Sequence, residues 1–90
     1  MTGTIWKWVL RIADEQEIEV PKGTKLISAG WDPKTGTCVW GEVPRPNAPK
    51  VKILILIVGT GHRLPDLKGR FIGTAIMLDM GLVWHVYEVS

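Results

Sequence analysis

Cysteine and long apolar runs are both scarce in this 90-residue chain. The single cysteine, Cys38, excludes a disulfide within the chain, and no secretory signal segment is evident in the sequence. Because disulfide frameworks are typical of small secreted proteins, we exclude that class and expect a protein of a reducing, intracellular compartment. The longest apolar run, residues 53–58, is far shorter than the roughly 18 residues that indicate a membrane span, so we expect a soluble protein without a membrane partner.

Long helical patterns are also lacking. The 10 glycines and 6 prolines are spread along the chain, and no window of about 12 residues repeats apolar side chains at helical spacing. A hydrophobic content of 46% against 22% charged residues allows a buried core, which excludes disorder as the main description. We therefore expect one folded domain over residues 1–90. A domain of this length buries only about 60–65% of its unfolded surface, so we expect a homo-oligomer, with a dimer as the default.

Short apolar runs bounded by turn residues predict about six or seven strands. The run at residues 50–58 becomes apolar on both faces after Lys52, which is typical of a central strand, and we expect another subunit to cover its second face. Three prolines between residues 44 and 49 predict a loop. The predicted fold class is all-β, a compact antiparallel barrel or sandwich of short strands with no long helix. The expected strands are residues 5–12, 17–20 (at a sheet edge), 25–31 and 37–43 (a hairpin), 50–58, and 71–78 and 82–89 (a second hairpin).

Tryptophan is unusually frequent, with five residues. Alternation in the first predicted strand puts Trp6 and Trp8 on one face, so Trp8 should pack more deeply than Lys7. Two indoles on one face can form a platform for a flat ligand, a nucleobase or a protein neighbour. The same face is predicted to carry Leu10 and Ile12, and core packing is the expected role of Trp31, Trp40 and Trp84.

Basic side chains are unevenly distributed. Residues 44–73 contain six lysines and arginines but only one acidic residue, Asp66. Such a stretch is a candidate for an anion-attracting surface, whereas the other interpretation is a solvated basic face that keeps an apolar protein in solution. The small net charge of +2 and the lack of basic runs argue against nucleic acid as a partner.

A polar loop follows the most apolar strand, because residues 59–63 read Gly-Thr-Gly-His-Arg. Glycines let backbone N–H groups turn inward as a concave nest, and histidine and arginine donate hydrogen bonds to phosphate or carboxylate. We therefore predict an anion-binding site, although the spacing is not that of a Walker phosphate loop and a simple strand-ending turn would use the same glycines. The predicted ligand-binding residues are Gly59, Thr60, Gly61, His62 and Arg63, with Arg70 and Trp6 expected to complete the site.

Patterns for a metal, a cofactor or catalysis are missing. His62 and His85 lie far apart without a second ligand at a recurring metal-motif spacing, and His85 should face away from the apolar side of its strand. We expect Cys38 in the core or at an interface, although its pairing with a histidine stays open. Because no nucleophile, base and orienting group fall in one neighbourhood of the sequence, we predict no enzyme, no metal and no cofactor.

Four segments carry a family resemblance: residues 12–23, Gly-Thr-Gly-His-Arg-Leu-Pro at 59–65, Phe-Ile-Gly-Thr at 71–74 and Val-Trp-His-Val-Tyr-Glu at 83–88. In their order and spacing they resemble a family of small uncharacterised all-β proteins encoded mainly by bacteriophages and prophages. The resemblance spans nearly the whole chain. It implies a phage accessory protein in the cytoplasm of the bacterial host, where such proteins often counter host defence by binding a protein or a nucleotide signal.

Taken together, these features favour a non-catalytic protein that binds and sequesters a small phosphorylated or nucleotide-like ligand. One alternative is a protein inhibitor that docks an aromatic and basic patch on a host defence protein, since tryptophan and arginine are enriched at binding hot spots. A small structural or assembly protein of the phage particle is a further alternative.

Overall fold

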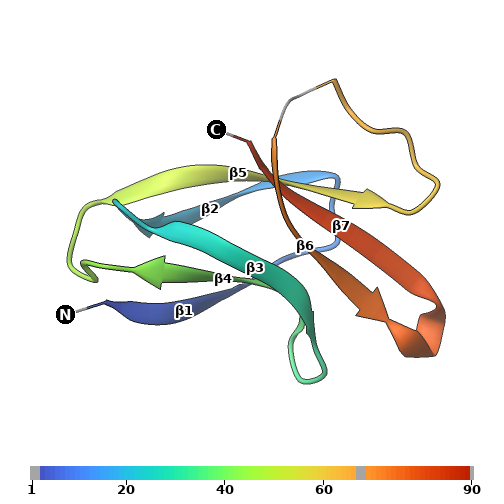
Figure 1. Cartoon of the computed structure of the whole chain (residues 1–90), viewed down its shortest axis with the longest axis horizontal. Coiled ribbons are helices and arrows are strands. Elements are labelled where there is room, and N and C mark those ends of the chain that lie inside the picture. Colours follow the sequence, from blue (N-terminus) through green and yellow to red (C-terminus); the bar gives the residue numbers. More distant parts are fainter. Residues whose placement is uncertain (1–2, 67–68, 90) are drawn as a thin grey trace.

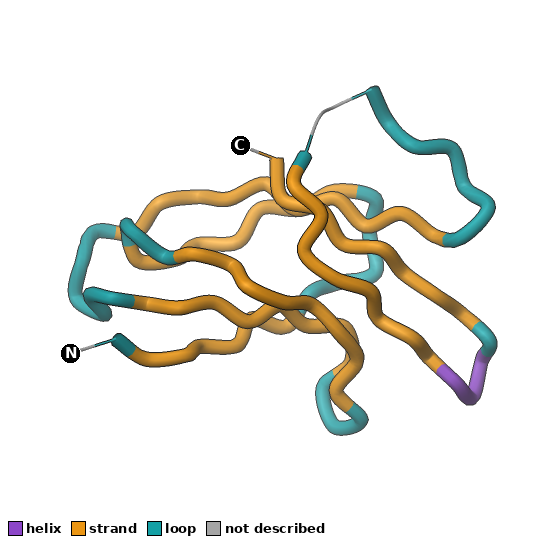
Figure 2. The backbone as a smooth tube through the Cα atoms, in the orientation of Figure 1, coloured by secondary structure: helices purple, strands orange, loops and turns teal. Residues whose placement is uncertain are grey.

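The computed structural model describes residues 3–66 and 69–89 of the chain. This part of the chain is built mainly from antiparallel strands (Figure 1). One 3₁₀ turn, η1 (Leu78–Met80), is coloured purple in the tube view of Figure 2. No helix in the described ranges is long and apolar enough to cross a membrane. The strands are β1 (Thr4–Val9), β2 (Glu15–Pro21), β3 (Lys25–Asp32), β4 (Gly36–Val43), β5 (Lys50–Gly59), β6 (Arg70–Met77) and β7 (Leu82–Val89).

The strands form two antiparallel sheets, one ordered β1-β4-β3 and the other β2-β5-β7-β6. The predicted all-β antiparallel fold is confirmed, and the two sheets do not close into a single barrel. They approach most closely where β3 meets β6. There the Arg70 guanidinium donates a 2.7 Å hydrogen bond to the Leu26 carbonyl oxygen, and a Cβ on Gly73 would lie 2.6 Å from the Ala29 carbonyl oxygen. Glycine at position 73 is therefore what allows the two backbones to come this close.

The hydrophobic core contains inward-facing residues from both sheets. Leu26 and Val39 come from one sheet, and Ile55 and Val86 come from the other. Trp84 packs against this core from β7. The other buried members are Leu10, Ile18, Val20, Ile57 and Ile72.

The alternation predicted for the first strand holds over part of its length. The Trp6 and Trp8 rings lie 6.0 Å apart between centroids, and Trp8 packs against the core whereas Lys7 is exposed, as predicted. Leu10 is buried, but Ile12 is 55% exposed and its predicted place on the core face is wrong. The reason is that β1 ends at Val9, so the period of two does not continue to Ile12.

β5 is a central strand between β2 and β7, and β2 is a sheet edge, both as predicted. Ile55 and Ile57 point into the core, so Leu56 lies on the outer face of the sheet, where it is nevertheless only 4% exposed. Its neighbour on β7 is Tyr87, which packs edge to face against Phe71 at 5.6 Å between ring centroids. Tyr87 and Phe71 of the same chain therefore lie near Leu56 on the outer face of this sheet.

The predicted hairpins are present, as β3 with β4 and as β6 with β7, and residues 44–49 form the predicted loop between strands. Cys38 is fully buried, in agreement with a core role. Trp31 is 38% exposed, so core packing was the wrong prediction for it. It stands next to the β3–β4 turn, where its ring lies 3.5 Å from the position of a Cβ on Gly36. Because Trp31 lies near the end of β3, its ring packs against the β3–β4 turn and not against the opposite sheet.

Candidate functional site

The polar turn after β5 is fixed to the neighbouring strand β7. Gly59 pairs with Trp84, the Thr60 amide donates to the Val83 carbonyl at 3.2 Å, and the His62 amide donates back to the Gly59 carbonyl at 3.0 Å. Gly61 has φ of 88°, a left-handed conformation that favours glycine. The segment is thus a tight turn whose side chains start from defined positions.

His85 orients two hydroxyl groups on the outer face of the sheet. Its Nε2 lies 2.9 Å from the Thr60 hydroxyl, and its Nδ1 lies 3.3 Å from the Thr74 hydroxyl. A neutral imidazole donates through one nitrogen and accepts through the other, so the two contacts fix the ring between β6 and the turn. His85 faces away from the core, as predicted from the alternation, since its neighbours Trp84 and Val86 both contribute to the core.

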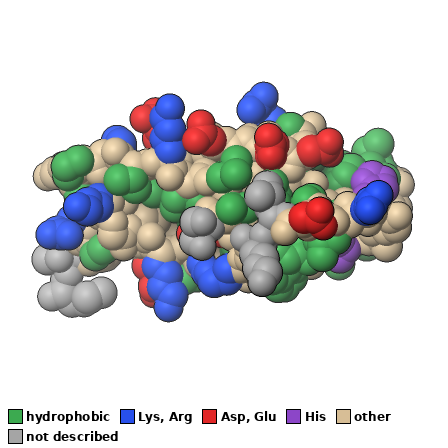
Figure 3. Space-filling view, turned by 90° about the horizontal axis from the view of Figure 1, so that it is seen from above, with side chains coloured by type: hydrophobic (Ala, Val, Ile, Leu, Met, Phe, Trp, Pro, Cys, Tyr) green, Lys and Arg blue, Asp and Glu red, His purple; other side chains and the backbone are tan. Residues whose placement is uncertain are grey.

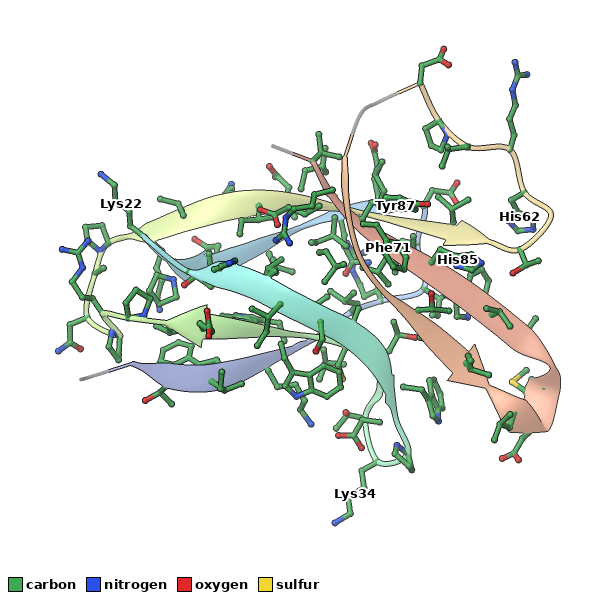
Figure 4. All side chains as sticks on the ribbon, in the orientation of Figure 1. Lys22, Lys34, His62, Phe71, His85 and Tyr87 are labelled. Atoms are coloured by element: carbon green, nitrogen blue, oxygen red, sulfur yellow. The ribbon has the colours of Figure 1, made fainter. Side chains whose placement is uncertain are left out.

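His62 folds back over the end of β5, where it packs edge to face against Trp84 at 6.4 Å between ring centroids. Gly59 makes room for this arrangement. A Cβ at that position would lie 2.9 Å from His62 Nδ1 and 3.1 Å from the Trp84 ring. Figure 4 shows His62 and His85 at the same end of the molecule. The indole N–H of Trp84 is already engaged, since it donates to the Met77 sulfur at 3.2 Å, so the ring offers only apolar contact.

A small hollow of about 200 Å³ lies beside Thr60, His62 and Trp84. The hollow has room for one phosphate or carboxylate group with a small organic part. It is smaller than the roughly 300–1,000 Å³ typical of sites that enclose a drug-sized ligand. No acidic side chain of the described residues lines it. The lining residues are Gly59, Thr60, His62, Gly81, Leu82, Val83 and Trp84.

The structure brings Gly59, Thr60 and His62 together around this hollow, with Gly61 at the exposed apex of the turn. Arg63 is exposed and is not among the lining residues. The two remaining predicted residues lie elsewhere.

Arg70 has a structural role. Its guanidinium donates a hydrogen bond to the Leu26 carbonyl oxygen and forms an ion pair with Glu88 at 2.7 Å. Glu88 is four positions along β7 from Trp84, about 13 Å for an extended strand. Trp6 is on β1 in the other sheet, where the Lys50 ammonium group sits 5.1 Å from its ring centroid. The expectation that Arg70 and Trp6 complete the site at the turn is therefore corrected.

The basic stretch of residues 44–73 does not form one surface in the described part of the chain. Lys50 lies over Trp6, Lys52 is opposite Glu19 on the β2 edge, and Arg70 pairs with Glu88. Lys68 lies outside the described residues. Charges that are adjacent in sequence are dispersed here because the strands carry them to different sides of the fold.

Sequence reasoning missed the contributions of Thr74, Trp84 and His85. They come from the second hairpin, and only the pairing of β5 with β7 brings them to the turn. A polar His85 between Trp84 and Val86 was the one available signal.

Comparison with known proteins gives a family match. The model of a family described as "Domain of unknown function (DUF7352)" matches residues 1–90. No curated protein and no solved structure matches the chain.

Proposed function

The chain belongs to the DUF7352 family, and we propose that it is a non-catalytic protein that binds and sequesters a small anionic, nucleotide-like ligand. The observation that carries the proposal is the hollow of about 200 Å³ at the end of β5, where Thr60 and His62 stand beside Trp84. A hydroxyl and an imidazole are donors suited to a phosphate oxygen, and the indole ring offers an apolar wall to the adjoining organic part.

Preorganisation supports binding at this place. The Thr60 backbone is bonded to β7, and its hydroxyl is held by His85. A ligand therefore meets donors whose conformational entropy was already lost on folding, which improves affinity. The hollow suits one charged group, so the rest of a nucleotide would extend over the exposed surface around Arg63.

The neighbours of His85 favour binding over catalysis. Thr60 and His85 stand at the distance of a nucleophile and its base, 2.9 Å. The second ring nitrogen, however, contacts the neutral hydroxyl of Thr74. In hydrolytic triads a carboxylate at that nitrogen stabilises the imidazolium that forms during proton transfer, and a neutral hydroxyl does so much less.

The cellular role in this proposal follows from the resemblance to phage- and prophage-encoded proteins. In the cytoplasm of an infected bacterium, a protein that sequesters a nucleotide signal would lower its free concentration and so blunt the host defence. We also propose that the protein acts as a homo-oligomer, with a dimer as the default.

A second candidate function is inhibition of a host protein through the outer face of the β6–β7 hairpin. Phe71 and Ile76 lie on this face and are 52% and 51% exposed, and contiguous exposed apolar surface marks interaction sites. Such side chains are typical anchors of protein interfaces.

The ultraviolet spectrum of protein freshly purified from bacteria separates the two candidates. A retained nucleotide adds its absorption band to that of the tryptophans and is identified by mass spectrometry after denaturation. If the purified protein instead carries no nucleotide and copurifies stoichiometrically with one bacterial protein, inhibition replaces sequestration as the function.

A further inference from the structure

A larger hollow lies at the opposite end of the molecule, between the β2–β3 turn and the loop joining β4 to β5. Its volume is about 640 Å³, which falls within the range of ligand sites. Figure 4 labels Lys22 at this end, and His62 marks the other end of the longest axis. In the space-filling view of Figure 3, Lys and Arg side chains stand at the same left-hand end. The lining residues are Lys22, Pro44, Arg45, Pro46, Asn47, Ala48 and Pro49.

Backbone hydrogen bonds and prolines constrain the walls of this hollow. The Lys22 amide donates to the Pro49 carbonyl at 2.8 Å, which ties the β2–β3 turn to the end of the proline loop. Within the loop the Ala48 amide donates to the Arg45 carbonyl at 3.0 Å. The three prolines each fix φ near −65°, so the loop loses little further entropy when a ligand binds.

Two positively charged residues without an ion partner in the described chain line the hollow. Among the described residues, neither Lys22 nor Arg45 forms an ion pair, whereas the cations of Lys7 and Arg70 are paired with carboxylates. The Arg45 guanidinium reaches over the β2–β3 turn, because its Nη2 lies 3.9 Å from the position of a Cβ on Gly23. No acidic residue of the described chain lines the hollow. Neither cation is neutralised by a carboxylate of the described chain.

We infer that this hollow is a second binding site, for a phosphate-bearing small molecule of mononucleotide size. The ammonium of Lys22 and the planar guanidinium of Arg45 would hold the phosphate oxygens, the latter through paired donors. The proline rings and Ala48 provide apolar surface against which a flat organic ring packs, and the Asn47 amide can both donate and accept at the ring edge. The assignment is independent of the hollow at Thr60, which lies at the far end of the fold.

Adenosine diphosphate is a suitable probe, and its titration into ¹⁵N-labelled protein locates the site. We expect shifts of the backbone amides of Lys22, Gly23, Asn47 and Ala48, together with an affinity that falls as salt is added. Shifts confined to the turn at residues 59–63, or no binding, would overturn the inference.

Variants then test the two cations directly. The double change Lys22→Ala and Arg45→Ala should weaken binding of adenosine diphosphate at this site by more than about tenfold, because charge-assisted contacts are lost. Neither side chain bonds within the described fold, so the variant should stay folded by circular dichroism. Lys34→Ala, which removes an exposed charge from the β3–β4 turn, is the matched control and should bind as the wild type does. Equal affinity of the double variant and Lys34→Ala contradicts the inference. Inorganic phosphate should bind more weakly than the nucleotide, and equal affinities would contradict the role of the proline surface.

Discussion

The hydroxyl of Thr60 lies 2.9 Å from Nε2 of His85, although the two residues are 25 positions apart in the chain. The contact exists because β5 and β7 are neighbours, with Val58 opposite His85. It ties the turn at residues 59–63 to the sheet and orients the side chain of Thr60, a residue that lines the hollow. The anion site proposed here depends on this connection.

Thr60→Val tests the connection, since it removes the hydroxyl but keeps the shape of the side chain. We expect a loss of about 1 kcal/mol in the free energy of unfolding and weaker ligand binding, because His85 loses a hydrogen-bond partner. Thr4→Val is the control, since Thr4 is an exposed strand residue in β1. Denaturant titration and calorimetry measure the two effects. Equal behaviour of the two variants would show that the hydroxyl contributes neither to stability nor to binding.

Gly73→Ala should strongly destabilise the fold. The added Cβ would lie 2.6 Å and 2.7 Å from the Ala29 carbonyl oxygen and amide nitrogen, which are backbone atoms that cannot rotate away. Overpacking of this kind costs about 1–3 kcal/mol or more. Gly30→Ala is the matched change on the facing strand, because its Cβ would meet the Trp40 ring at 3.6 Å and the Thr74 carbonyl oxygen at 4.0 Å, both ordinary contact distances. Denaturant midpoints that are the same for both variants would contradict the close approach of β3 and β6.

Trp8→Ala should cost about 3–5 kcal/mol, since the ring packs against the core. Trp6→Ala should lower the free energy of unfolding by less, because the Trp6 ring is not part of the core cluster and has Trp8 and the Lys50 ammonium group as neighbours. Thermal unfolding of the two variants gives the comparison. An unchanged melting temperature for Trp8→Ala would place its ring outside the core.

The Lys7–Asp32 ion pair predicts a pH dependence of stability. The hydrogen bond from Lys7, at 2.9 Å, and the one from the Lys34 amide lower the pKa of Asp32 below its ordinary value of 3.8. The hydrogen bond to Asp32 raises the pKa of Lys7 above 10.5. The Asp32 contribution is therefore present above pH 3.8 and is lost as the pH falls through the lowered pKa. The Lys7 contribution is present below pH 10.5 and is lost as the pH rises through the raised pKa.

Asp32→Asn isolates this pair, since the amide oxygen can still accept from Lys34. The difference in unfolding free energy between wild type and variant should be small at neutral pH, as for other exposed pairs, and should vanish in strong acid. Urea titrations at about pH 7 and about pH 2 provide the comparison. A difference that is the same at both values would show that the pair does not contribute.

Much of the fold could be predicted from local patterns. The apolar run of β5, the two hairpins and the proline loop each have a signal within a few adjacent residues. The end of β1 at Val9 has no such local signal, because Ile12 continues the alternation in the sequence although the strand has already ended. Pairings between strands that are distant in sequence, such as β1 with β4 and β2 with β5, also leave no local signal.

The candidate site was predictable to a smaller extent. The glycines on both sides of Thr60 predicted the turn. That Trp84 and His85 lie beside it could not be predicted, because it depends on which strand pairs with β5. Arg70 could be counted as a basic residue near the turn in sequence, whereas its partner Glu88 is visible only once β6 pairs with β7. Net charge along the chain therefore overestimated the charge available to a ligand.

Calorimetric titration with cyclic dinucleotides and ADP-ribose derivatives tests the proposed function most directly, carried out on the wild type, His62→Ala and Arg63→Ala. The wild type should bind at least one of these ligands. His62→Ala should lose about 1.5–3 kcal/mol of binding free energy, and Arg63→Ala should lose less, with a salt-dependent effect, because it lies outside the hollow. Failure of the wild type to bind any of them, or equal affinity of wild type and His62→Ala, would contradict sequestration of a nucleotide-like ligand at this site.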